Sequence, residues 1–180
     1  MPQQLSITEI CTALEKAQAD LTGYCNSLPG DLFFYQPATK WSAAQQVKHL
    51  TTATQTASLA YTLPKFLVRW VGGKPNRPSR AYDELVAKYK QKLQEGGKAS
   101  GRYVPKMVPA GYGKEKLLQS FTAAMNRMSR AIANRWQEQQ TDQYIVAHPL
   151  LGKITVRELA YFTIYHTYHH LDSIRELTTR

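Results

Sequence analysis

Histidine is the residue type whose placement in this sequence points most directly to chemistry. His166 and His170 stand four residues apart in a segment with helical periodicity, so their imidazoles project from one face of a helix on successive turns. Such a pair can offer two nitrogens to a single metal ion. His169 lies close enough in angle to take the place of His170, and the spacing does not decide between them. The simpler alternative is a pair of core histidines that are satisfied internally.

A third histidine, His49, belongs to another predicted helix, on the side that also carries Ala53, Ala57 and Ala60. These small neighbours leave space beside the ring. Imidazoles without partners are costly in a core, whereas one metal ion would satisfy all three together. The alternative is a lone, half-buried His49 that is hydrogen-bonded to a backbone carbonyl, and the periodicity of the sequence fits both.

Three neutral imidazoles around a divalent ion would leave its charge uncompensated and at least one coordination position open, which is typical of reactive sites. A water or thiol at that position has a lowered pKa and is a nucleophile near neutral pH. Hydrolysis and sulfur transfer are both natural outcomes. Basic side chains such as Arg69, Arg77 and Arg102 could hold an anionic substrate. Asp172 and Glu158 are candidate general bases by proximity alone, and both are predicted to be helix-surface groups.

The elements that must position these residues are helices, and no segment shows convincing strand alternation. Capping boxes begin at Ser6, Ser42 and Thr155. The predicted helices cover 6–28, 42–63, 80–94, 114–139 and 155–180. Four of them are long and carry one apolar stripe, which favours an all-α fold, an antiparallel four-helix bundle. We predict a single domain over 1–180, with a basic helix-loop insertion at about 65–112 between the second and third core helices, laid on the outside of the bundle.

Composition narrows the classes of protein. The chain has 180 residues, 43% of them hydrophobic and 20% charged, which is ordinary for a folded protein. No apolar run is long enough to cross a bilayer and no signal segment is evident, so a cytoplasmic location is expected. Cys11 and Cys25 are predicted to be small core residues too far apart to bridge each other. The net charge of +10 favours an anionic partner, although no nucleic-acid-binding motif accompanies it, so nucleic acid is not the expected partner.

Three stretches together resemble the DinB/YfiT-like superfamily of metal-binding four-helix bundles, and their order and spacing agree over nearly the whole chain. The first runs from Gln36 through Trp41-Ser42 to His49-Leu50, like the family's entry into its second helix. The second, His148 to Thr155, is similar to the turn before the last helix. The third is His166-Thr167-Tyr168-His169-His170, which resembles the family's His-x-x-His-His signature.

The resemblance implies a metal site of His49, His166 and His170, with His169 as a neighbour that does not bind the metal and His148 as a residue that holds its turn. It also implies zinc, nickel or manganese as the metal, and a low-molecular-weight thiol as a cosubstrate in some members. The expected function is therefore a metal-dependent thiol S-transferase or hydrolase that acts on a small molecule. A homodimer is compatible with the resemblance. The alternative function is a non-catalytic, metal-stabilised module whose basic face binds nucleic acid or an acidic partner.

Overall fold

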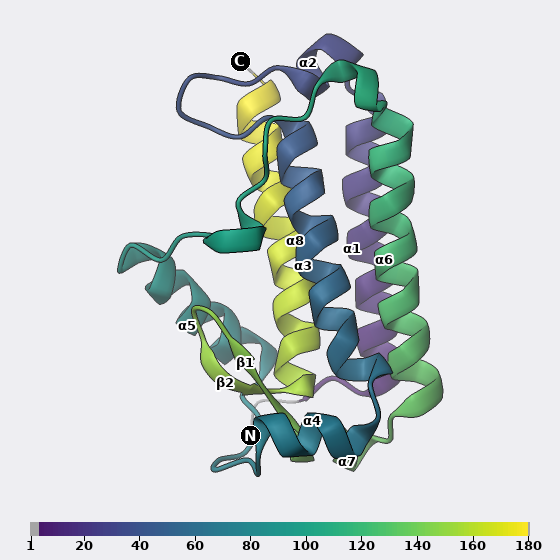
Figure 1. Cartoon of the computed structure of the whole chain (residues 1–180), viewed down its shortest axis with the longest axis vertical. Helices are drawn as coiled ribbons and strands as arrows, with labels where there is room; N and C mark the ends of the chain where they lie inside the picture. Colours follow the sequence, from purple (N-terminus) through teal and green to yellow (C-terminus); the bar gives the residue numbers. More distant parts are fainter. Residues whose placement is uncertain (1–3, 180) are drawn as a thin grey trace.

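Four long helices pack side by side within residues 4–179, the range that the computed structural model describes (Figure 1). They are α1 (Ile7–Ser27), α3 (Ala43–Thr62), α6 (Lys114–Arg135) and α8 (Val156–Thr178). Their apolar stripes meet in one buried core, so the predicted four-helix bundle is confirmed.

The contacts between the ends of the long helices show which of them run parallel and which run antiparallel. α3 runs antiparallel to α8, and α1 runs antiparallel to α6, whose first residue, Lys114, bonds carbonyls just at and beyond the end of α1. The other two neighbouring pairs, α1 with α8 and α3 with α6, run parallel: Leu5 meets Tyr161 near the starts of α1 and α8, and Tyr24 meets Thr178 near their ends. The antiparallel arrangement therefore holds for α1 with α6 and for α3 with α8, and the parallel pair α3 and α6, which follow each other among the long helices, requires a long connection.

Local signals explain where the helices begin. The side chains of Ser6, Ser42 and Thr155 each accept a hydrogen bond from the backbone three residues on, and Glu9, Gln45 and Glu158 reach back to complete the predicted capping boxes. α3 ends at Thr62, before Pro64, as expected from the missing amide hydrogen of proline.

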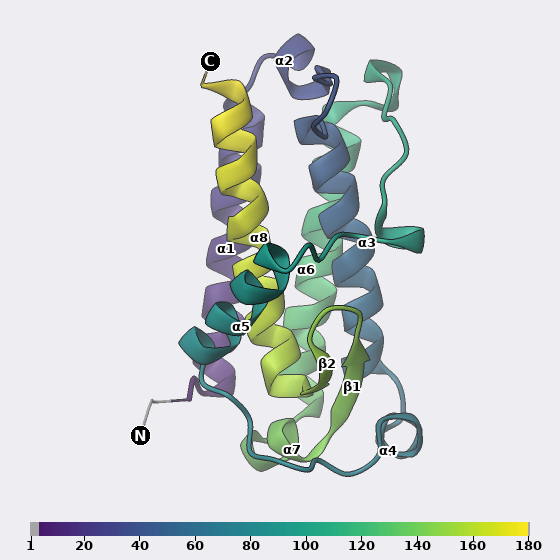
Figure 2. The same cartoon turned by 90° about the vertical axis from the view of Figure 1, so that its left-hand side faces the viewer.

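Shorter elements fill the connections between the long helices. They are α2 (Gly30–Phe34), α4 (Lys65–Gly72), α5 (Tyr82–Gln94), the 3₁₀ turns η1 (Gly101–Tyr103) and η2 (Ala110–Tyr112), α7 (Glu138–Gln143), β1 (Ile145–His148) and β2 (Gly152–Thr155). The segment between α3 and α6 contains α4, α5, η1 and η2, so the predicted insertion lies where expected. Its helix α5 packs on α8, and α4 packs on β1 (Figure 2).

The β1–β2 hairpin corrects the expectation that the chain has no strands. The two strands are antiparallel, with Ile145 opposite Thr155 and His148 opposite Gly152. Each strand has four residues, too few for alternation to stand out in the sequence. Gly152 has a positive φ of 70°, which a residue with a side chain rarely adopts, and it lets the chain reverse here.

A second correction concerns the third long helix, predicted to reach residue 139. α6 ends at Arg135, because Trp136 adopts an extended conformation and its indole Nε1 donates a hydrogen bond to the carbonyl of Tyr61. Trp136 is buried, and this tertiary contact outweighs the local helical preference. A new short helix, α7, follows.

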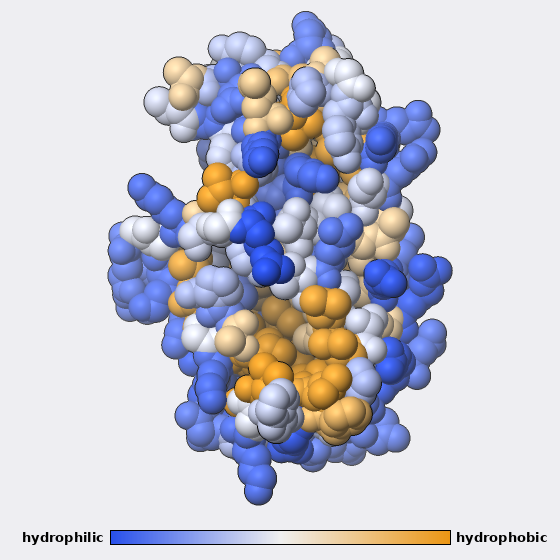
Figure 3. Space-filling view, in the orientation of Figure 1, coloured by the Kyte–Doolittle hydropathy of each residue, from blue (hydrophilic) through white to orange (hydrophobic). Residues whose placement is uncertain are grey.

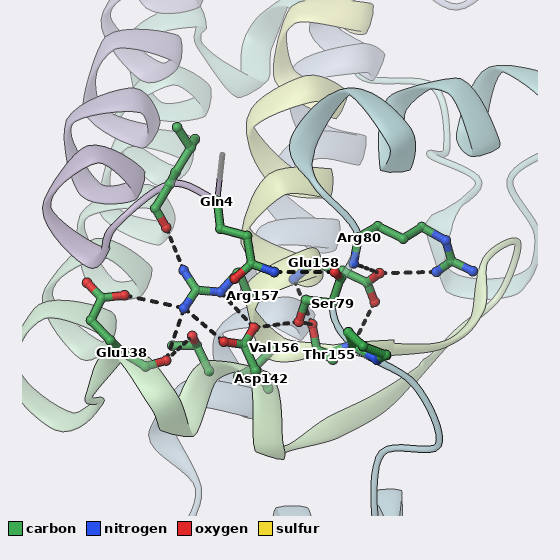
Figure 4. A network of polar contacts seen from close by, with 12 residues as sticks. Gln4, Ser79, Arg80, Glu138, Asp142, Thr155, Val156, Arg157 and Glu158 are labelled. Atoms are coloured by element: carbon green, nitrogen blue, oxygen red, sulfur yellow. Dashed lines mark hydrogen bonds and ion pairs between the residues drawn. The ribbon is translucent and has the colours of Figure 1, made fainter. Parts of the chain in front are cut away.

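A buried ionic network joins the beginning of α8 to the insertion and to α7 (Figure 4). Glu158 is completely buried, which corrects the expectation of a surface position. Its carboxylate accepts hydrogen bonds from the guanidinium groups of Arg77 and Arg80 and from the backbone of Arg80 and Thr155. Beside it, the guanidinium of Arg157 bonds both carboxylate oxygens of Asp142 at 2.7 and 3.0 Å. The insertion is thus fixed to the bundle by ion pairs between its two partly exposed arginines and the buried Glu158.

We expect Gly72→Ala to lower the free energy of unfolding by about 1–3 kcal/mol, because an added Cβ cannot fit between α4 and β1. That Cβ would lie 1.8 Å from the carbonyl oxygen of Ile145, which is backbone and cannot rotate away. Gly23→Ala, in the exposed interior of α1 with nothing within 4 Å, is the control and should stabilise the protein by about 0.5–1 kcal/mol. Urea unfolding of both variants is the measurement, and equal effects would contradict the close approach.

Within the described part of the chain, no helix is both long and apolar enough to cross a membrane.

Candidate metal centre

The antiparallel neighbours α3 and α8 bring three buried histidines together at mid-height in the bundle. His49, early in α3, faces His166 and His170 near the middle of α8. The Nε2 atom of His166 lies 3.1 Å from Nε2 of His49 and 3.2 Å from Nε2 of His170. One nitrogen from each ring therefore falls within 4.8 Å of the others, and the cluster is able to hold a metal ion.

The outer nitrogens of two rings have fixed partners. Nδ1 of His49 lies 2.6 Å from the backbone carbonyl oxygen of Tyr103, and Nδ1 of His170 lies 2.9 Å from the side-chain oxygen of Gln46. Both partners are assigned as acceptors, so both Nδ1 atoms carry the ring proton and donate it. The Nε2 atoms of His49 and His170 are then left with lone pairs that point at His166.

This proton count indicates that a cation fits between the rings. A neutral His166 carries at most one proton on Nε2 and can donate it to only one of its two neighbours. The other short contact then has no hydrogen bond, and if His166 carries its proton on Nδ1 instead, both contacts bring lone pairs together, which repel each other. Two nitrogens bound to one tetrahedral zinc at about 2.0–2.1 Å are about 3.4 Å apart, close to the observed separations.

The surroundings keep the three rings neutral. Burial lowers the pKa of His49 and holds the pKa of His166 and of His170 well below the ordinary value, and the neighbouring histidines add to the shift. Aromatic rings pack against the cluster: Trp41 lies 5.2 Å from His49 between ring centroids, and Phe162 stacks on His166 at 4.8 Å. Neutral imidazole is the form that binds metal ions.

The other sequence candidates lie elsewhere. His169 stacks on Tyr165 and is outside the cluster of converging nitrogens, although it lines the adjoining cavity. His148 holds its turn, as expected, because its Nδ1 accepts hydrogen bonds from the backbone of Leu150 and Leu151. Asp172 is exposed, as predicted.

The expected arginine site for an anionic substrate is not what the structure shows. Arg77 is paired with Glu158 at 2.8 Å, and Arg69 lies over the ring of Tyr144 at 4.8 Å. Arg102 is exposed on η1. Among the described residues that line the cavity beside the histidines, none is an arginine. The reason is that the surplus charge of the insertion serves structural contacts or faces solvent.

A cavity of about 840 Å³ opens beside the three histidines, large enough for a drug-sized ligand. Its walls come from α3, α4, α8, the hairpin and the loop after α5. In the surface view, apolar residues line a hollow in the lower half of the molecule (Figure 3). The histidine cluster is thus accessible from a largely apolar chamber.

Sequence reasoning missed the two groups that orient the rings. Gln46 precedes His49 by three residues, which places it on the same face of α3, but the ring that it orients is His170, 124 residues further along the chain. The carbonyl of Tyr103 comes from a loop 54 residues further along the chain, and nothing in the sequence marks a backbone oxygen as a partner. The orientation of His49 depends on the insertion.

Comparisons with known proteins agree with this architecture. A family model described as the DinB superfamily matches residues 13–174. The structure of YfiT from Bacillus subtilis is similar, with a TM-score of 0.58 and 18% sequence identity over 97% of this chain and 86% of that chain. YfiT is described as a probable metal-dependent hydrolase with an unusual four-helix bundle topology. No curated protein sequence matches the chain significantly.

Proposed function

We propose, from the premise that this chain belongs to the DinB superfamily, that it is a metal-dependent enzyme whose ion is held by His49, His166 and His170. The observation that carries the proposal is the convergence of three Nε2 atoms. Those of His49 and His170 carry no proton, because the Nδ1 atom of each ring holds it in a hydrogen bond to an oxygen. A divalent ion with three protein ligands supplies a water or thiol nucleophile near neutral pH.

The residues around the cluster support a reactive site rather than a purely structural one. Structural zinc sites are normally closed by four protein ligands. Within the described residues, the candidate cluster has three members, and it faces the cavity of about 840 Å³. The apolar walls exclude bulk water from a bound substrate, and Trp41 and Phe162 fix the planes of the rings they touch.

The first test is metal content followed by reaction type. We expect elemental analysis of protein purified without chelator to find about one equivalent of zinc, nickel or manganese. The metal-loaded protein is then assayed for hydrolysis of 4-nitrophenyl esters and for conjugation of a low-molecular-weight thiol to 1-chloro-2,4-dinitrobenzene. Activity that EDTA removes and that added metal restores supports the proposal. A protein that binds metal but catalyses neither reaction would favour the non-catalytic module instead.

Gln46→Leu should weaken metal binding about 10–100-fold, because outer partners of metal-binding histidines orient the ring and fix its tautomer. Gln46 is buried and its side-chain oxygen accepts from Nδ1 of His170, whereas leucine has a similar volume and no acceptor. Competition with a chromophoric chelator gives the affinity. Gln45→Leu is a less suitable comparison because Gln45 caps α3. Gln55→Leu, at an exposed position of the same helix, is the matched control and should bind metal as the wild type does.

A further inference from the structure

The cavity is elongated along α3. The residues that line it include His49, Ala53, Ala57 and Ala60 of α3 and Leu63, which directly follows this helix; they recur at helical spacing on one face. From His49 to Leu63 the helix rises about 21 Å at 1.5 Å per residue. The cavity therefore extends from the histidine cluster to the end of the bundle at which α3 finishes and α4 begins.

The wall of this long chamber is apolar away from the histidines. Three small alanines of α3 leave the space open, and the opposite side is formed by larger apolar groups of α4, β1 and α8. These groups include Leu67, Val68, Val71, Ile145, Val146 and Leu159. At the α4 end, Trp70 lines the cavity while 82% exposed, so this end opens to solvent. A burial surface of this kind favours an apolar ligand.

The fixed charge on the cavity lining is positive. Among the described residues that line the cavity, Lys98 is the one permanently charged side chain, and none is a carboxylate. Lys98 lies in the loop that leads to Ser100 and Tyr103, and the carbonyl of Tyr103 bonds His49. A metal ion in the cluster would add two further positive charges to this region. A negatively charged head group would therefore meet positive charge at the histidine end and only apolar side chains at the other end.

From these observations we propose that the cavity binds an elongated apolar molecule with one anionic head group, such as a medium-chain carboxylic acid or a derivative of it. The head lies at the histidine cluster beside Lys98, and the tail lies along Ala53, Ala57 and Ala60 toward Trp70. This proposal depends on the proposed function in one respect: the head group is taken to be the part of the ligand that reacts at the metal. It narrows the substrate class from any small electrophile to one with a long apolar tail.

The tryptophans make the orientation measurable. Trp41 lines the histidine end, Trp70 lines the open end, and Trp136 is buried in the core with its indole bonded to Tyr61. Bromine quenches indole emission at short range. We would titrate 2-bromododecanoate and 12-bromododecanoate, below their micelle concentrations, into the Trp41→Phe and Trp70→Phe variants in metal-free and zinc-loaded form. Unbrominated dodecanoate is the control for effects other than quenching.

The expected result is saturable quenching that depends on the position of bromine. 2-Bromododecanoate should quench Trp41 more deeply than Trp70, and 12-bromododecanoate should do the reverse. The absence of saturable quenching, quenching that is independent of bromine position, or the opposite pattern would overturn the proposal. Because the readout is binding, position-dependent quenching of a protein that takes up no metal would support the ligand class while contradicting the metal-dependent enzyme.

A filled cavity provides the second test. Ala57→Phe places a large ring in the middle of the chamber and should weaken dodecanoate binding about tenfold or more, equivalent to about 1.4 kcal/mol or more. Ala19→Phe, at an exposed position of α1, is the matched control and should bind as the wild type does. Zinc affinity should be unchanged in both variants, because neither position contacts the cluster. Wild-type dodecanoate affinity in a folded Ala57→Phe protein would exclude this chamber as the binding site.

Discussion

His166→Ala is expected to bind zinc about 10²–10³-fold more weakly than the wild-type protein. Structural zinc sites with four ligands are worth about 10–16 kcal/mol, so one ligand is worth roughly 3–4 kcal/mol, which is a factor of this size. His166 is the central member of the cluster, since its Nε2 is within 3.2 Å of both other Nε2 atoms. Competition with a chelator of known affinity gives the ratio.

The neighbouring position supplies the control for this experiment. His169→Ala removes an imidazole from the same turn of α8, and His169 also lines the cavity, but it stands outside the converging nitrogens. It should keep wild-type zinc affinity. This comparison also decides between His169 and His170, which the helical spacing left open. Equal losses in the two variants, or no loss in His166→Ala, would show that the cluster is not the metal site.

Glu158→Ala should lower the free energy of unfolding at neutral pH by about 3 kcal/mol, or roughly 6–12 °C in Tm. The carboxylate is completely buried and accepts hydrogen bonds from Arg77, Arg80 and Thr155. Its loss leaves two arginines without their partner and releases the insertion from α8. This loss of stability is at the lower end of the range found when a buried ion pair is broken, because both guanidinium groups are partly exposed to solvent. Glu176→Ala, exposed on the same helix, is the control and should change stability little.

The same carboxylate predicts a pH dependence. Burial raises the pKa of Glu158, but the hydrogen bonds and charge of Arg77, together with the backbone of Arg80 and Thr155, outweigh it and hold the pKa below its ordinary value. A depressed pKa contributes stability that is complete above the unfolded-state pKa of about 4.3 and is lost as the pH falls through the folded value. The stability gap between wild type and Glu158→Gln should therefore shrink as the pH is lowered below about 4. A gap independent of pH between 7 and 3 would contradict this assignment.

Local signals in the sequence were sufficient to predict the four-helix bundle. Side chains at Ser6, Ser42 and Thr155 act on backbone amides three residues away, so their capping boxes were visible without tertiary information. The i,i+4 pair on α8 was a candidate from spacing, whereas the periodicity left His49 undecided and the resemblance to a family added it to the set; the structure brings the three together. The resemblance to a family placed His170, rather than His169, in the set.

What the sequence did not show depends on contacts between distant segments. α6 ends at Arg135 because Trp136 finds a carbonyl on α3, and Glu158 is buried because the insertion folds back to cover it with two arginines. Neither partner is near in sequence. The prediction that Arg77 binds an anionic substrate was not met for the same reason. The sequence does not show whether an arginine is free or paired with a carboxylate from a distant segment. The hairpin was missed because its strands are short.

The parallel pairing of α3 with α6 has an evolutionary consequence. α6 is about 33 Å long at 1.5 Å per residue, so the chain must travel back over the height of the bundle before α6 begins, which takes at least about ten extended residues. Residues 63–113 make this return journey and exceed the minimum several times over. A long connection is therefore required by this helix order. It also supplies part of the cavity wall and the Tyr103 carbonyl that orients His49, so changes in it during evolution would alter both the choice of ligand and the candidate metal centre while the order of the four helices is kept.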